Sequence, residues 1–151
     1  MAYEDGPYVQ VACFCEMTLE DKTGTMSIIR IVDTITTSAR GPSPPEDMPA
    51  VTHNLKMVLM FKSGMAGGRS TIRVVPRDPD GSTKDPIILT VHFEGDEKGH
   101  NVVANIAYTF SHEGVYWFDV CVEDTKVTSI PIRIKYDRMV VGPMPQQPPA
   151  G

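Results

Sequence analysis

Hydrophobic residues alternate with polar ones along most of this chain, and no stretch repeats its apolar residues with a helical period. The alternation is clearest over residues 8–19, whose odd positions carry Val9, Val11, Cys13, Cys15, Met17 and Leu19. Successive side chains of a strand point to opposite faces, so a period of two predicts a half-buried strand. A chain with this pattern throughout is expected to fold as an all-β protein.

The same period recurs in eight segments that turn-forming residues separate. We predict strands over residues 8–19, 26–35, 53–62, 70–76, 87–93, 102–110, 115–123 and 126–136. Four prolines between residues 37 and 52 predict a long irregular crossing there, because proline removes backbone donors. These elements favour an antiparallel β-sandwich of about eight strands, with a small closed β-barrel as the alternative.

Length and composition bound the domain organisation and the compartment. At 151 residues the chain holds one core, and we expect an N-terminal extension (1–7), a β-sandwich domain (8–138) and a flexible proline-rich tail (139–151). A formal net charge of −5 argues against a nucleic-acid partner. No apolar run approaches the roughly 20 residues that span a bilayer, and no signal-peptide pattern is present. We therefore expect a cytoplasmic protein with no membrane partner.

Three motifs resemble a known family. The segment GVYWFDV (114–120) is similar to a G-x-Y-x-F-x-V closing strand, SIIRIVD (27–33) to a D-G-K-L-S-I-I-G-I-F-D opening hairpin, and PRDPDG (76–81) to a V-D-P-D-G turn. Together they resemble an uncharacterised bacterial family of domains of unknown function. The resemblance implies an immunoglobulin-like or C2-like sandwich, with a corner hydrogen bond from Tyr116. It supplies no catalytic residue, and this chain carries Arg30 where that family prefers glycine.

Patterns that support catalysis or metal binding are missing from the sequence. It contains no G-x-S-x-G motif, no phosphate loop before a helix, and no matched Cys and His spacing. Cys13 and Cys15 are therefore interpreted as buried, reduced thiols, and the acidic residues in predicted turns as solvated. We expect no enzymatic activity, no cofactor and no metal.

Apolar residues on both faces of two predicted strands are the strongest functional signal. In a sandwich the outer face of a strand should be polar, so a second apolar face predicts a cover or an association surface. The crossing at 37–52 is one candidate cover. We predict a non-enzymatic module that acts through a protein partner or as a homo-oligomer. The predicted interface residues are Ile28, Val32, Val58 and Met60.

A small-ligand-binding β domain is the alternative function. Pockets of this class combine apolar and aromatic walls with a few polar groups. The predicted wall residues for such a pocket are His92, Tyr108 and Trp117.

Overall fold

A computed structural model describes residues 6–95 and 98–142 of the chain. The described residues form nine strands and no helix. The strands are β1 (Tyr8–Glu20), β2 (Met26–Val32), β3 (Thr34–Gly41), β4 (Val51–Lys62), β5 (Gly67–Arg77), β6 (Ile87–Glu94), β7 (Gly99–Phe110), β8 (Gly114–Val122) and β9 (Thr125–Val140).

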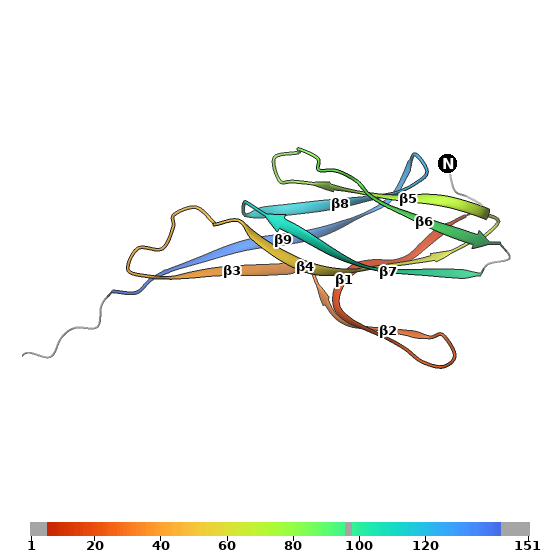
Figure 1. The fold of residues 1–151 in the computed structure, drawn as a ribbon, viewed down its shortest axis with the longest axis horizontal. Coiled ribbons are helices and arrows are strands. Elements are labelled where there is room, and N and C mark those ends of the chain that lie inside the picture. The colour runs from red at the N-terminus through yellow and green to blue at the C-terminus, as the bar shows by residue number, and fades with distance from the viewer. Residues whose placement is uncertain (1–5, 96–97, 143–151) are drawn as a thin grey trace, which may run out of the picture.

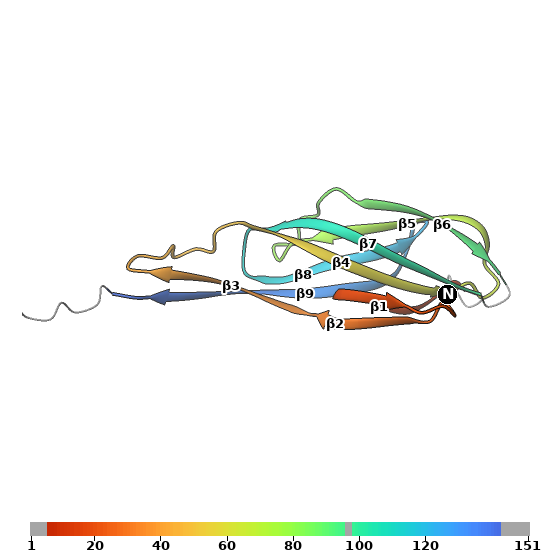
Figure 2. The same ribbon diagram turned by 60° about the horizontal axis from the view of Figure 1, so that its bottom comes forward.

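The strands make two sheets that pack face to face (Figure 1). Sheet A has the order β2-β1-β4-β7, and sheet B has the order β3-β9-β8-β5-β6. The second view shows the same two layers and a long β3–β9 ribbon that reaches beyond them (Figure 2). The predicted all-β sandwich is therefore confirmed, and the barrel alternative is set aside.

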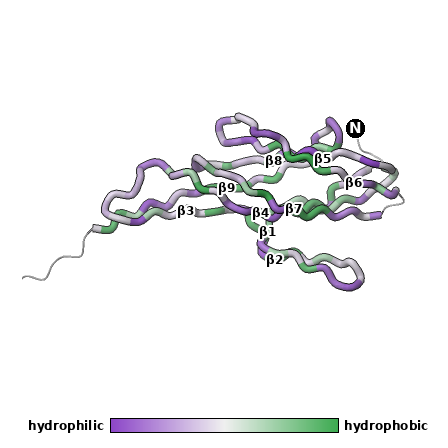
Figure 3. The backbone as a smooth tube through the Cα atoms, viewed as in Figure 1, coloured by the Kyte–Doolittle hydropathy of each residue, from purple (hydrophilic) through white to green (hydrophobic). Residues whose placement is uncertain are grey.

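The core lies between the sheets, where the apolar parity of each strand points inward. An aromatic cluster made by Tyr108, Phe110, Tyr116 and Phe118 has ring centroids 4.8 to 6.1 Å apart. Phe14 of sheet A meets Phe118 of sheet B edge-on, with centroids 4.8 Å apart. Hydrophilic and hydrophobic residues alternate along the strands, as expected for strands with one face toward this core (Figure 3).

The closing motif behaves as its resemblance implies. The Tyr116 hydroxyl donates a hydrogen bond to the His112 carbonyl oxygen at 2.8 Å, which is the expected corner bond. Gly114 begins β8 with a φ of 133°, and a Cβ there would lie 2.9 Å from Pro79. The motif glycine is therefore required both by the backbone conformation and by the close approach of the 78–82 turn.

The prediction of one continuous strand over residues 26–35 is wrong. The segment divides at Asp33 into β2 and β3, which belong to different sheets, and the Asp33 carbonyl accepts a hydrogen bond from the Arg133 backbone N–H. β3 then pairs in parallel with β9, so the sandwich is not wholly antiparallel. Because β3 extends to Gly41, the irregular crossing covers only residues 42–50.

Strand β9 runs to Val140 and so continues past the predicted domain boundary at residue 138. The rest of the predicted extension and tail lies largely outside the described residues, which omit 1–5 and 143–151.

Candidate functional site

The β1–β2 hairpin bends away from the rest of sheet A, strands β4 and β7, at one pair of residues (Figure 1). Cys15 pairs with Ile31 and Met17 pairs with Ile29, and Glu16 and Arg30 lie between these two pairs. Arg30 has a φ of 57°, a left-handed conformation that favours glycine. Its Nε lies 3.2 Å from Glu16 Oε2, so an exposed ion pair spans the bend. The departure from the family's glycine thus falls on the hinge of the hairpin.

We call the part of the hairpin beyond this bend, residues 16–32, the flap. It folds back beneath sheet A (Figure 1). Met26 and Ile28 of the flap pack against a second apolar cluster that is separate from the main core. Its buried members are Cys13, Cys15 and Val58. The cover over the outer face of sheet A is therefore the flap and not the crossing at 37–52, which corrects the predicted cover.

The opposite side of the flap is apolar and faces solvent. Met17 keeps 49% of its surface exposed, Leu19 keeps 54% and Ile31 keeps 63%. Met17 and Ile29 are direct cross-strand partners on this side. The flap therefore hides one apolar face of the protein and presents another.

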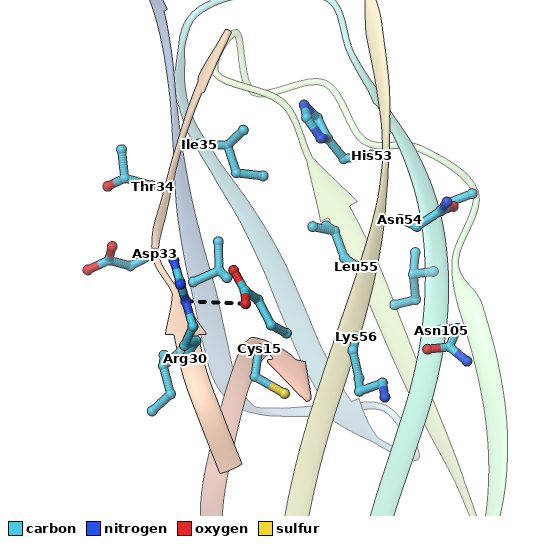
Figure 4. Close-up of a pocket in the computed structure, with 15 residues that line it drawn as sticks. Cys15, Arg30, Asp33, Thr34, Ile35, His53, Asn54, Leu55, Lys56 and Asn105 are labelled. Carbon is cyan, nitrogen blue, oxygen red and sulfur yellow. Dashed lines mark ion pairs between the residues drawn. The ribbon is translucent and has the colours of Figure 1, made fainter. Parts of the chain in front are cut away.

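A groove of about 880 Å³ opens where the chain passes from the flap into β3. We call it the switch groove. It is lined by residues 15–16, 30–35, 53–56 and 105–107. In the close-up, Ile35, His53 and Leu55 point into the space between β3 and β4, whereas Asp33 and Thr34 point away from it (Figure 4).

Strand β4 has an open edge along this groove. On one side it pairs with β7 over its whole length, from Val51 to Lys62. On the other side its pairing with β1 runs from Lys62 only to Lys56, because β1 turns away with the flap. Among the described residues, no strand covers that side of β4 over residues 51–55. Backbone N–H and C=O groups of alternate residues there point into the groove.

A buried side-chain nitrogen in the groove also lacks a hydrogen-bond partner within the described part of the chain. His53 Nε2 is buried and has no hydrogen-bond partner among the residues that the structure describes. The His53 ring lies against Phe110, with centroids 5.9 Å apart. Lys56 lies at the other end of the groove near Cys15, and burial raises the pKa of the Cys15 thiol. A thiol with a raised pKa stays protonated at neutral pH and is a poor nucleophile.

The predicted interface residues are brought near one another but are mostly internal. Val58 has no exposed surface, while Ile28 and Met60 are half-buried beside it in the second cluster. Val32 instead packs against the main core and lines the switch groove. The exposed apolar residues lie on the other side of the flap, where their odd-position pattern had been interpreted only as a half-buried strand.

The three residues predicted for a ligand pocket do not come together. Tyr108 is buried in the main core, where its hydroxyl donates to Asp78 Oδ1 at 2.6 Å. Burial and this hydrogen bond raise the Tyr108 pKa. Trp117 pairs with Arg77 and His92 pairs with Arg69, at separate places in sheet B. The predicted pocket is therefore not formed by these residues.

The described residues, 6–95 and 98–142, hold neither a candidate metal site nor a candidate membrane-spanning helix. No group of three or more Cys, His, Asp and Glu side chains is placed to hold a metal ion there. No helix in that part of the chain is long and apolar enough to cross a membrane. Cys13, Cys15 and Cys121 are all free, and Cys13 and Cys15 are buried as the sequence predicted.

Comparisons with known proteins give a family but no activity. A family model described as "Family of unknown function (DUF6941)" matches residues 10–135. No curated protein matches the chain. Among solved structures, similarity is found to beta-glucosidase 3B from Thermotoga neapolitana in complex with glucose, with a TM-score of 0.41 and 15% identity over 54% of this chain and 14% of that one. A beta-glucosidase from Listeria innocua in complex with glucose gives a TM-score of 0.43 and 13% identity over 58% and 16%. The chain spans about one-sixth or less of these structures.

Proposed function

The chain belongs to the DUF6941 family, whose function is unknown, and we propose that it is a non-enzymatic protein-binding module. In this proposal the switch groove and the exposed side of the flap hold an extended segment of a partner. The observation that carries it is the open edge of β4 over residues 51–55, directly beside an exposed apolar surface.

The backbone supports a strand as the bound element. An open sheet edge presents unpaired N–H and C=O groups and is a template for another strand. Extended peptides bind proteins by adding to such an edge, with main-chain hydrogen bonds giving affinity and side-chain pockets giving specificity. A segment entering the switch groove would continue the line of β1 along β4.

The side chains favour a segment with apolar residues at alternate positions. Ile35 and Leu55 point into the groove, and Ile31 lies at its mouth with 63% of its surface exposed. Every second residue of the bound segment would face this surface. Exposed apolar patches of this kind mark interaction sites on soluble proteins. The segment comes either from another protein or from a second copy of the chain, which would make a homo-oligomer.

Support for the immunoglobulin-like subtype of sandwich comes from the Tyr116 corner bond, which that group shares. Many binding modules use this architecture, but the groove and the flap, and not the fold, would provide the binding surface here.

Selection from a library of random peptides, together with sedimentation velocity of the free protein, tests the proposal. We expect either self-association or enrichment of peptides with alternating apolar residues. In both cases the double variant Leu19→Lys/Ile31→Lys should weaken binding more than tenfold while its thermal melt stays unchanged.

The matched control is Ile88→Lys, because Ile88 is 57% exposed but lies on β6 of the other sheet. Binding that survives in Leu19→Lys/Ile31→Lys, or that Ile88→Lys weakens equally, contradicts the proposal. So does a monomeric protein that enriches no peptide.

A second candidate function is binding of a small ligand in the same groove. It is favoured by the unpartnered Nε2 of His53, which a ligand could satisfy. A thermal-shift screen should then find a compound that stabilises the wild type and has no effect on His53→Phe. A screen without any stabilising compound would remove this candidate.

A further inference from the structure

The outer face of sheet B is rich in cations, although the chain as a whole has a net charge of −5. We call this surface the basic face. Its exposed members lie on β5 and β9, and they are Arg69, Arg73, Lys126, Arg133 and Lys135.

The strand register places these residues on one side of the sheet. Arg73 pairs with Cys121, which in turn pairs with Lys126. Val115 pairs with Arg133 in the same sheet, and directly paired residues share a face. Residues 115 and 121 are six positions apart on β8, so these two rows are about 20 Å apart at 3.3 Å per residue. A segment that touches both rows must itself be extended.

Five cations on this face have no carboxylate of the described residues within ion-pair distance. Arg77 is the exception, since its guanidinium makes two 3.2 Å hydrogen bonds to the Asp119 carboxylate. The five members of the basic face make no ion pair with any residue in the described ranges. The carboxylates of Asp119 and Glu113 lie on or beside this face, but the cations outnumber them, so its local charge is positive and opposite in sign to that of the whole chain.

Two features of the basic face are shaped for contact. A hollow of about 380 Å³ is lined by residues 113–115 and 133–135, so Arg133 and Lys135 border it together with Glu113, whose Oε1 accepts a hydrogen bond from the Tyr136 backbone N–H. Beside it, Trp117 is half-buried with the Arg77 guanidinium 5.9 Å from its ring centroid. Tryptophan and arginine are the residue types most enriched at the energetic centres of protein interfaces.

We propose that the basic face is a docking surface for an acidic, extended segment of a partner protein. Carboxylates of the segment would pair with Arg133 and Lys135 at the hollow and with Arg73 and Lys126 at the far row. Arginine forms paired hydrogen bonds with carboxylates, which gives such contacts direction as well as charge. A long polyanion such as nucleic acid is disfavoured, because its affinity depends on many phosphate contacts and the remaining surface repels it.

This site is on the sheet opposite the flap, so it stands independently of the proposed function. Binding of a short oligoglutamate peptide at low ionic strength tests it, with oligoglutamine and a single-stranded oligonucleotide of the same formal charge as the comparison probes. We expect oligoglutamate to bind more tightly than either and to weaken as salt is added.

The variant Arg133→Glu/Lys135→Glu should weaken oligoglutamate binding at least tenfold. The control Lys22→Glu/Lys62→Glu makes the same change in net charge away from the basic face and should weaken it less than threefold. Thermal melts of both variants establish that they are folded. If the two variants lose binding equally, if the oligonucleotide binds more tightly, or if oligoglutamate does not bind, the proposal is overturned.

Discussion

The two outer faces of the sandwich differ in what covers them. On sheet A the outer face carries Cys13 and Val58, and the chain's own flap lies over it. On sheet B the outer face carries Arg73, Asp119 and Arg133, and no strand covers it within the described residues. The outer face that the chain covers is therefore apolar, and the outer face that it leaves open is charged.

Covering sheet A with the flap also has consequences for the backbone and for the surface. Folding the flap back requires the bend at Arg30 and leaves β4 without a partner over residues 51–55. The flap also carries an apolar outer side of its own, at Met17 and Leu19. Covering sheet A therefore moves the exposed apolar surface outward and opens an edge beside it. Both features are the basis of the proposed binding function.

The largest effect is expected from placing a charge on each outer face. Val58→Asp buries an unpaired carboxylate beneath the flap and should lower the free energy of unfolding by about 3–5 kcal/mol. Arg73→Asp on the open face should change it by about 0.5 kcal/mol or less. Urea denaturation of both variants makes the comparison. Equal losses would mean that the two faces are equally covered.

A smaller effect is expected at the bend of the flap. Arg30→Val forces a β-branched residue into a left-handed conformation and should destabilise the protein by about 1–2 kcal/mol. Arg30→Gly should be close to neutral, because relief of strain offsets the lost exposed ion pair. Denaturation midpoints of the two variants distinguish them. Greater damage from glycine than from valine would show that the ion pair, and not the backbone, sets the bend.

The smallest effect concerns the ion pair on sheet B. Hydrogen bonds from Arg77 hold the pKa of Asp119 below its usual value, with a further bond from Ser129. A lowered folded pKa means that the stabilisation is present above about pH 3.9, the ordinary value for Asp, and is lost as the pH falls through the folded value.

Asp119→Asn should therefore cost about 1 kcal/mol at pH 7 and make the acid side of the stability curve shallower. Thermal melts of both proteins between neutral and acid pH measure this. Parallel curves of melting temperature against pH for the wild type and the variant would contradict the assignment of this acid dependence to Asp119.

The sequence predicted the parts of the fold that depend on local alternation. Tyr116 and Phe118 point into the core as the period of two requires, and the two-sheet architecture is confirmed. The break at Asp33 was missed because apolar residues continue on both sides of it. The chain changes sheets at this point because β3 pairs with β9, which is distant in the sequence. The period of the apolar residues gives no information about such long-range pairing.

The candidate sites were less predictable for the same reason. Val58 was recognised as one of a second set of apolar residues, but its cover is set by how the flap folds back. The switch groove exists because the pairing of β1 with β4 ends at Lys56. No pattern of residues in the sequence predicts where that pairing ends. One available signal was Arg30 at a position where glycine was expected, which marks the bend. Arg73 and Lys126 of the basic face are distant in the sequence and lie near each other only because their strands pair on either side of β8.

Residue-resolved hydrogen exchange of the backbone amides of β4 tests the central claim most directly. Amides that are paired in a sheet are protected, while those at an open edge exchange with solvent. We predict slow exchange throughout residues 56–62 and fast exchange at alternate residues of 51–55, where β1 no longer pairs. Uniformly slow exchange from residue 51 to residue 62 in the free monomer would show that the edge is already covered, and would contradict the account.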